Sequence, residues 1–286
     1  MPWIGRISIV VLLGVAASLA LGSAAYEASD HAASAEPQLH LTTASPDSAA
    51  AAYAVFDAET GTVLYTKNAD DVRPIASITK LFAAAAIIDT FDLEQSTTLS
   101  WADLQSHGTA GALEPQQTYT YRELLFPLLL SSSNNASLTF SRRSEHNGYS
   151  LTSRAESIAR AGGPSSIRLA DTSGLSSDNI SSATDLARAT YQLQQSHPYV
   201  LSISGLSSYV GTHQGWLNNS PFIDDETFLG GKHGYTEAAG RTAVALFTET
   251  IDGEERAIGY VVLGSSDLAR DVAELRTHVQ HSVVWR

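Results

Sequence analysis

The sequence contains no cysteine and only three lysines among its 286 residues. Without cysteine, disulfide bonds, thiolate zinc sites and iron–sulfur clusters are all excluded. Basic residues as a whole are few: 17 lysines and arginines stand against 30 acidic residues, which gives a net charge of −13. Because phosphate binding requires a basic surface, this balance argues against a nucleic-acid partner. It argues equally against electrostatic binding to anionic lipid.

Motifs for nucleotides and metals are also missing from the sequence. We find no Gly-x-Gly-x-x-Gly, no Walker loop and no His-Glu-x-x-His, which excludes the common dinucleotide, nucleotide and zinc-protease interpretations. His278 and His281 share a face of the predicted last helix, but no carboxylate motif lies beside them. We therefore expect neither a metal site nor a cofactor.

The first 25 residues have the pattern of a secretory signal peptide. Arg6 precedes an apolar run over residues 7–21, and small residues follow at 22–25. A short basic start, an apolar core and a small-residue exit are typical of such a peptide, and we expect cleavage near Ala25. The alternative is an uncleaved N-terminal anchor, because a membrane span needs about 20 apolar residues. Either outcome predicts an exported protein that contacts a membrane only through this segment.

The rest of the chain divides into a linker and one domain. Residues 26–50 are rich in Ala and Ser without an apolar period, which is typical of a flexible linker. Residues 51–286 are predicted to form a single α+β domain, an antiparallel sheet packed with helices plus an inserted helical lobe. The expected elements are a hairpin over 52–56 and 62–65, a buried helix over 77–90, helices over 121–130 and 182–195, strands over 242–247 and 257–263, and a last helix over 267–282.

The segment Ser77-Ile78-Thr79-Lys80 places a hydroxyl and an amine three residues apart at the start of a predicted helix. Residues at this spacing share a face of a helix. A serine hydroxyl becomes nucleophilic when a base takes its proton, and lysine is such a base only when burial or a nearby positive charge keeps it neutral. The backbone N–H of Ser77 is also well placed to help hold an oxyanion. A serine cap beside a surface lysine is the alternative, but the apolar residues after Lys80 argue against it.

A second motif, Ser132-Ser133-Asn134, follows an apolar run where a predicted helix gives way to a polar turn. A second hydroxyl near Lys80 can pass a proton to a leaving amine, and an amide side chain can hold both substrate and lysine. The register is ambiguous, because Ser133-Asn134-Asn135 has the same spacing; we choose Ser132 and Asn134. A plain Ser/Asn turn is the competing interpretation.

A third motif, Lys232-His233-Gly234-Tyr235-Thr236, follows two glycines and precedes a β-type run. Glycine in an edge strand lets another backbone approach closely, as a bound peptide requires. Lys232 supplies a charge for a substrate carboxylate, and Thr236 or His233 can hydrogen-bond it. The backbone N–H of Tyr235 is the predicted second oxyanion donor. A surface loop with a stray lysine is the alternative.

Together these segments resemble the low-molecular-mass penicillin-binding proteins, the serine-type D-alanyl-D-alanine carboxypeptidases and endopeptidases. The order Ser-x-x-Lys, Ser-x-Asn, Lys-x-Gly is their signature, and the resemblance covers about residues 52–283. It rests on Pro74 to Lys80, Ser132 to Ala136, Ser173-Gly174-Leu175 with Asn179, Ser182 to Leu186, and Gly231 to Gly240.

The resemblance implies a DD-peptidase/β-lactamase-like fold and an acyl-enzyme mechanism without a cofactor. It makes Ser77 the acylated nucleophile, Lys80 its base, Ser132 a proton relay, Asn134 a substrate ligand and Lys232 the carboxylate clamp. The implied substrates are peptidoglycan stem peptides that end in D-Ala-D-Ala, with β-lactam antibiotics as covalent inhibitors. The implied location is the periplasm or cell surface of a bacterium.

Two departures from the family pattern leave alternatives open. His233 stands where the family usually has Thr or Ser. This difference supports the alternative that the protein binds peptidoglycan without catalysing a reaction. The chain ends just past the last predicted helix, as in the shorter endopeptidase branch, so the choice between carboxypeptidase and endopeptidase stays open. A β-lactamase of the same fold needs a glutamate base; Glu145, Glu156 and Glu226 lie in the right interval, but none has the expected Glu-x-x-Leu-Asn setting.

Overall fold

A computed structural model describes residues 39–41, 45–108 and 111–285, which belong to one compact unit. The predicted signal peptide or anchor lies outside these residues, as does most of the predicted linker. At the end of that linker, Ser48 and Ala50 are already buried, and the hydroxyl of Ser48 donates to Asp271. Packing therefore begins slightly before residue 51. Among the described helices, none has the length and hydrophobicity that a membrane span requires.

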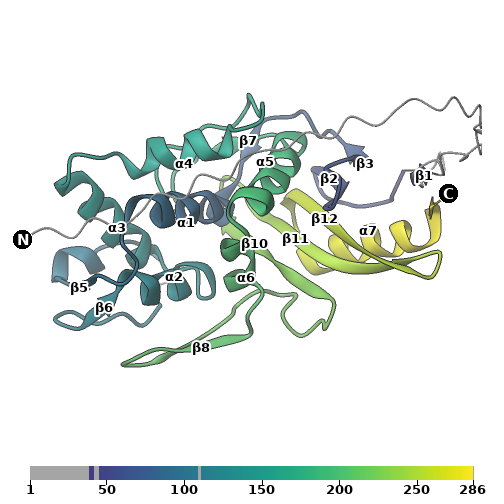
Figure 1. Cartoon of the computed structure of the whole chain (residues 1–286). Coiled ribbons are helices and arrows are strands. Elements are labelled where there is room, and N and C mark those ends of the chain that lie inside the picture. The colour runs from purple at the N-terminus through teal and green to yellow at the C-terminus, as the bar shows by residue number, and fades with distance from the viewer. Residues whose placement is uncertain (1–38, 42–44, 109–110, 286) are drawn as a thin grey trace, which may run out of the picture. The chain divides into compact units, whose positions relative to one another are not determined.

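The described chain is built on a five-stranded antiparallel sheet in the order β10-β11-β12-β2-β3 (Figure 1). The strands at the two ends of the domain meet where β12 pairs with β2, so the helical segments form an insertion between them. This arrangement confirms the predicted α+β fold with an antiparallel sheet. The strands are β2 (Ala52–Asp57), β3 (Val63–Lys67), β10 (Phe228–Thr236), β11 (Gly240–Ile251) and β12 (Glu254–Ser265).

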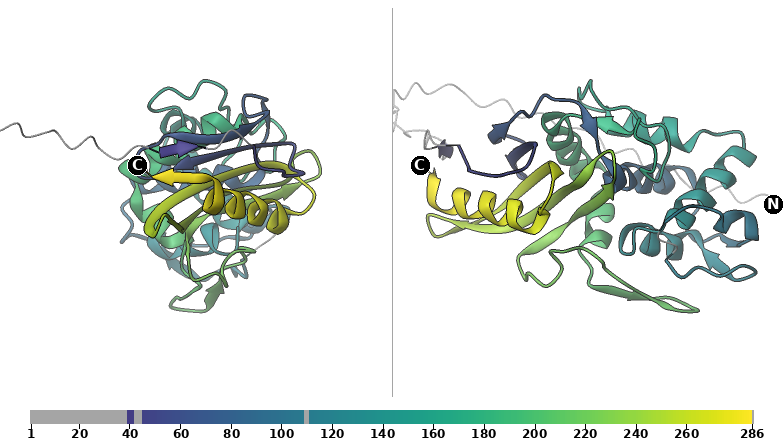
Figure 2. Two further views of the ribbon diagram at one scale, coloured as in Figure 1. Left: turned by 90° about the vertical axis from the view of Figure 1, so that its right-hand side faces the viewer. Right: turned by 180° about the vertical axis from the view of Figure 1, so that it is seen from behind.

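Helices cover both faces of the sheet. The C-terminal helix α7 (Leu268–Ser282), yellow in Figure 2, packs Val272, Leu275 and Val279 against one face. The other face joins a larger core that includes the buried helix α1 (Thr79–Thr90). The remaining helices are α2 (Tyr121–Leu129), α3 (Asn134–His146), α4 (Leu151–Ala159), α5 (Ala183–Ser196) and α6 (Pro198–Ser204).

Short strands and 3₁₀ turns connect these elements. The two-stranded pairs are β1 (Leu39–Leu41) with β13 (Val283–Trp285), β4 (Arg73–Pro74) with β7 (Ile180–Ser181), β5 (Ser96–Thr98) with β6 (Thr118–Thr120), and β8 (Ser208–Val210) with β9 (Gly215–Leu217). The 3₁₀ turns are η1 (Ala76–Ile78) and η2 (Trp101–Leu104).

Two local features differ from what the sequence predicted. The helix predicted over 77–90 begins at Thr79, because Ser77 lies in the turn η1, where Ala76 has a left-handed φ of 49°. Helix α3 was not predicted, because its polar sequence shows no clear apolar face. Its start is fixed instead by Ser133, whose hydroxyl accepts a hydrogen bond from the N–H of Ala136 at 3.1 Å.

Candidate active site

Ser77 lies half-buried where the helical lobe meets the edge of the sheet. Two glycines bring other backbone segments against it. A Cβ on Gly234 of strand β10 would lie 2.5 Å from the backbone N of Ser77, and a Cβ on Gly174 would lie 2.8 Å from the same atom. Glycine at both positions therefore lets three chain segments meet at one serine.

Lys80 is fully buried and has three polar neighbours. Its Nζ lies 3.0 Å from Oγ of Ser77, 2.8 Å from Oδ1 of Asn134 and 2.5 Å from the carbonyl oxygen of Ser173. The carbonyl and amide oxygens only accept hydrogen bonds, whereas the hydroxyl also donates. A neutral amine has two N–H groups and one lone pair. When the N–H groups point to the two oxygens, the lone pair faces the hydroxyl of Ser77.

The surroundings of Lys80 favour this neutral state. Burial, followed by the positive charge of Lys232, holds the pKa of Lys80 well below its usual value, while the carboxylate of Asp171 acts in the opposite direction. Lys232 is itself almost fully buried on β10, and burial lowers its pKa to about 7. Two lysines therefore share one site, and each has a depressed pKa.

The Ser-x-Asn segment enters the site at the start of α3. Asn134 contacts Lys80, and its Nδ2 donates to the carbonyl of His107 at 2.7 Å, which fixes the orientation of the amide. Ser133 serves instead as the helix cap and is fully buried. Of the two residues in the chosen register, Asn134 thus reaches Lys80. Ser132 is half-buried with a left-handed φ of 57°, and its hydroxyl has no hydrogen-bond partner within the described chain.

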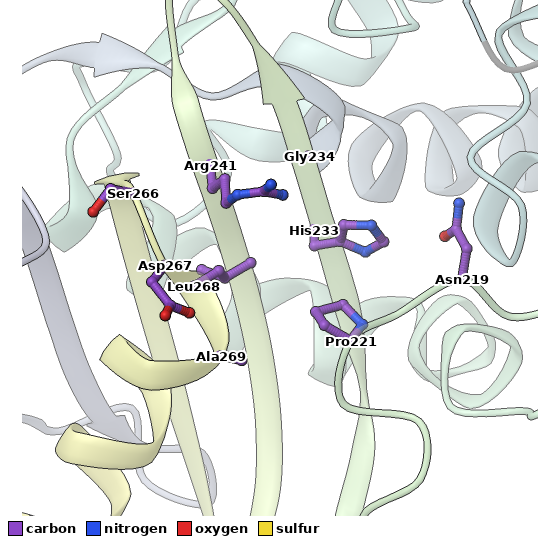
Figure 3. A pocket seen from close by; sticks show the side chains of 9 residues that line it. All are labelled: Asn219, Pro221, His233, Gly234, Arg241, Ser266, Asp267, Leu268 and Ala269. Atoms are coloured by element: carbon purple, nitrogen blue, oxygen red, sulfur yellow. The ribbon is translucent and has the colours of Figure 1, made fainter.

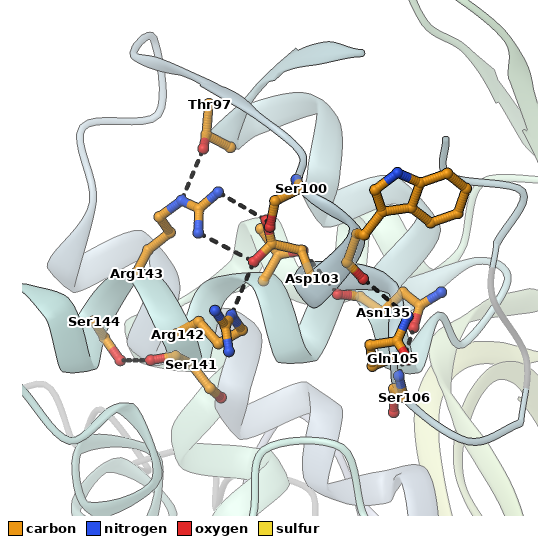
Figure 4. A network of polar contacts seen from close by, with 12 residues as sticks. Thr97, Ser100, Asp103, Gln105, Ser106, Asn135, Ser141, Arg142, Arg143 and Ser144 are labelled. Atoms are coloured by element: carbon orange, nitrogen blue, oxygen red, sulfur yellow. Dashed lines mark hydrogen bonds and ion pairs between the residues drawn. The ribbon is translucent and has the colours of Figure 1, made fainter. Parts of the chain in front are cut away.

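A polar network outside the site anchors α3 (Figure 4). The fully buried carboxylate of Asp103 in η2 accepts hydrogen bonds from Arg142 and Arg143, both on α3. A few residues later, the N–H of Ser106 donates to Oδ1 of Asn135 at 3.1 Å. The loop after η2 is therefore tied to the first turn of α3, from which the neighbouring Asn134 reaches Lys80.

Strand β10 forms the opposite wall and is an edge strand, as the glycines predicted. Nζ of Lys232 donates to the carbonyl of His233 at 2.8 Å. Tyr235, whose N–H is the predicted oxyanion donor, directly follows the glycine that packs against Ser77. The hydroxyl of Thr236 accepts a hydrogen bond from the N–H of Ala239 and so caps the turn into β11. The O–H of Thr236 can still donate to a substrate, as predicted, because this contact uses the oxygen only as an acceptor.

A pocket of about 450 Å³ opens beside this strand (Figure 3). His233 and Arg241 of the neighbouring strand line it, together with Asn219 and Asp267. Burial, then the positive charges of Lys232, Arg241 and Lys80, lower the pKa of His233 to about 3. The imidazole is therefore neutral at physiological pH.

The loop over residues 171–179 supplies a group that we did not predict, the carbonyl of Ser173. This oxygen accepts from Lys80 and lies 3.5 Å from Oγ of Ser77. The segment Ser173-Gly174-Leu175 contributed to the family resemblance without a role of its own. A main-chain carbonyl has no side-chain signature; the available signal was Asp171 followed by Thr, Ser and Gly, a pattern typical of a turn closed by a side chain.

Candidate bases for a β-lactamase lie apart from this cluster. Glu156 on α4 accepts from the N–H of Leu169 and pairs with Arg160, while Glu145 and Glu226 are exposed. Among the described residues, no contact links any of the three glutamates to Ser77. The part of the chain that the structure describes also contains no group of side chains suited to hold a metal ion.

Comparison with known proteins identifies the family. Residues 40–267 match the D-alanyl-D-alanine carboxypeptidase family. A D-alanyl-D-alanine endopeptidase of Pseudomonas aeruginosa is 31% identical over 136 residues, 47% of this chain and 44% of the relative. The chain thus spans less than half the length of that relative. A D-alanyl-D-alanine carboxypeptidase of Mycobacterium tuberculosis is 29% identical over 211 residues, 70% of each chain.

The fold comparison agrees. The crystal structure of a penicillin-binding protein from Listeria monocytogenes in its cefotaxime-bound form superposes with a TM-score of 0.70 at 24% identity. The match covers 80% of this chain and 96% of the Listeria chain. The predicted fold and family resemblance are both confirmed. The chain belongs to the D-alanyl-D-alanine carboxypeptidase family of serine peptidases.

Proposed function

We propose that this protein is a serine DD-carboxypeptidase that removes the terminal D-alanine from peptidoglycan stem peptides through an acyl-enzyme on Ser77. The observation that carries the proposal is the position of Lys80. This fully buried amine has a depressed pKa, lies 3.0 Å from the serine hydroxyl, and meets two oxygens that take up its N–H groups. A serine becomes a nucleophile in such a setting.

The proposed reaction has two steps. Lys80 takes the proton of Ser77, whose Oγ attacks the carbonyl carbon of the penultimate D-alanine. The N–H groups of Ser77 and Tyr235 hold the oxyanion. The C–N bond breaks, and a proton passes from Lys80, through the hydroxyl of Ser132, to the leaving amine of D-alanine. Water then attacks the ester and releases the shortened peptide.

Substrate binding is assigned to the remaining motif residues. Lys232 attracts the terminal carboxylate of the peptide, and Asn134 holds the peptide beside Lys80. His233 and Gly234 line the same part of the site, and the neutral imidazole offers one N–H to the carboxylate. β-Lactams are expected to acylate Ser77 in place of the peptide.

A second candidate, a DD-endopeptidase, is favoured by the similarity of this chain to the D-alanyl-D-alanine endopeptidase of Pseudomonas aeruginosa. Release of free D-alanine from a pentapeptide, measured against cleavage of a cross-linked dimer, separates the two activities.

We also propose that the protein is exported, to the periplasm or the cell surface. The support is the sequence of residues 1–25, with an apolar run between Arg6 and small residues near Ala25. Fractionation of cells, followed by N-terminal sequencing of the exported protein, distinguishes a cleaved signal peptide from an anchor. Recovery of the full-length chain in the cytosol contradicts export.

The primary test is intact-mass spectrometry after incubation with a labelled penicillin, followed by peptide mapping. We expect one stable adduct on Ser77, and no adduct on a folded Ser77→Ala variant. Rapid release of hydrolysed penicillin would instead favour the β-lactamase alternative. A folded wild-type protein that forms no adduct and turns over no penicillin would overturn the proposal in favour of a binding protein.

A further inference from the structure

Asp171 belongs to none of the three sequence motifs, but its carboxylate organises the loop that reaches the nucleophile and its base. Oδ1 accepts hydrogen bonds from the N–H of Ser173 at 2.7 Å, from the hydroxyl of Ser173 at 2.9 Å and from the N–H of Gly174 at 2.6 Å. Oδ2 accepts from the N–H of Ser176 at 2.7 Å. One side chain thus closes the whole turn over residues 171–176.

The hydrogen bond to Gly174 has a geometric consequence at the site. The N–H of Gly174 and the carbonyl of Ser173 belong to the same peptide unit. In a trans peptide these two groups point in opposite directions, and the described chain contains no cis bond. When Asp171 holds the N–H, the carbonyl therefore points away from it, and there it meets Nζ of Lys80.

The ends of the loop are anchored independently of Asp171. The hydroxyl of Thr172 lies 2.7 Å from the hydroxyls of Ser137 and Ser141 on α3. At the other end, the buried side chain of Asn179 accepts from the N–H groups of Ala170 and Asp171. These contacts place the loop, but none of them fixes the rotation of the peptide unit after Ser173.

We propose that Asp171 is a positioning residue for acylation: by holding the N–H of the Ser173–Gly174 peptide, it aims the carbonyl of that peptide at Lys80. The inference rests on the proposed function, in which Lys80 is the base. With one N–H of the neutral amine directed to Ser173 and the other to Asn134, the lone pair stays on Ser77. Without the first acceptor, the amine is free to rotate away from the hydroxyl.

The charge of Asp171 gives the proposal a distinctive signature. The charged groups that act on Lys80 are Lys232 on β10, which lowers its pKa, and Asp171, which raises it, while the neighbouring His233 is neutral. Acylation requires the neutral amine, so its rate rises with pH through the pKa of Lys80. Removal of the negative charge lowers this pKa and moves the rising limb to lower pH.

The test compares Asp171→Ala, Asp171→Glu and Asp178→Ala by the second-order rate of penicillin acylation between pH 5 and 9. Asp178 is exposed in the same loop and serves as the matched control. Asp171→Ala removes both acceptor oxygens and the charge, so we expect a loss of about 100-fold, the effect of a misplaced reacting group, with the rising limb at lower pH than in the wild type. Asp171→Glu keeps the charge but not the turn, so we expect the slower rate with an unshifted limb.

The outcomes distinguish a failure of the proposed function from a failure of the positioning role of Asp171. A wild-type protein that is never acylated refutes the proposed function before any variant is compared. Wild-type rate and pH profile in folded Asp171→Ala overturn the positioning role, and so does an equal loss in Asp178→Ala. A slower rate with no shift of the limb in Asp171→Ala supports the positioning role and assigns the whole loss to geometry rather than to the charge of Asp171. If Asp171→Ala does not melt cooperatively, Asp171→Glu decides: wild-type acylation by that variant overturns the proposal.

Discussion

The backbones of Gly174 and Ala76 lie so close that a Cβ on the glycine would be 2.0 Å from the carbonyl oxygen of Ala76. Both residues have left-handed φ angles, 83° at Gly174 and 49° at Ala76. Two left-handed backbone turns therefore meet directly before the nucleophile. A side chain on Gly174 would displace the turn that carries Ser77.

Gly174→Ala is expected to destabilise the protein by more than its backbone strain alone. A left-handed φ costs an alanine about 1–2 kcal/mol, and the clash with Ala76 adds about 1–3 kcal/mol. Gly253→Ala is the matched control, because Gly253 has the same φ of 83° and open space around its Cα. Urea unfolding measures both, and equal losses of unfolding free energy would contradict the close contact.

Lys232 is expected to produce a falling limb in the pH profile of acylation. With its pKa lowered to about 7, Lys232 loses its proton, and with it the attraction for a carboxylate, as the pH rises through 7. The rate constant for acylation by free penicillin should fall there, since this quantity reports the free enzyme. A penicillin ester, which lacks the carboxylate, should show no such fall. The same limb with both compounds would argue against Lys232 as its origin.

His233→Thr is expected to leave the shape of that profile unchanged. Because the pKa of His233 is lowered to about 3, the ring does not titrate between pH 5 and 9. The substitution exchanges one neutral hydrogen-bonding group for another, so we expect a change in acylation rate of about tenfold or less. A pH limb that disappears in the variant would show that His233 carries charge in this range.

Arg143 and Arg142 are expected to differ in their effect on stability, although both bind Asp103. Arg143 donates to both carboxylate oxygens and also to Thr97, whereas Arg142 is more exposed and makes one hydrogen bond. Arg143→Ala leaves a buried carboxylate poorly paired, which costs about 3 kcal/mol or more. Arg142→Ala should cost about 1 kcal/mol or less. Thermal unfolding of the two variants makes the comparison.

Sequence patterns predicted the sheet, the central helix and the residues that meet in the site. The strands were visible because buried β-branched runs end at turn residues, as in 242–247 and 257–263. Lys80 and Lys232 stood out because so few lysines occur elsewhere. The order of the three motifs then identified the family.

What the sequence did not reveal depends on tertiary contacts. Ala76 has a left-handed φ where the 171–179 loop packs against it, and the residue type of Ala76 gives no sign of this conformation. The carbonyl of Ser173 is a main-chain group that any residue could supply. The contact between the hydroxyl of Thr236 and the N–H of Ala239 was not predicted either.

Because lysine is scarce, chemical modification of lysine side chains can report whether the site is folded. Lys80 and Lys232 are 0% and 4% exposed, and the remaining lysine, Lys67, is partly exposed near the surface, where its Nζ donates to the carbonyl of Ser48. An amine-reactive reagent therefore meets one lysine side chain in the folded domain and three after unfolding. The proportion of molecules with one modified lysine, rather than three, therefore gives the fraction of a preparation that has an assembled site.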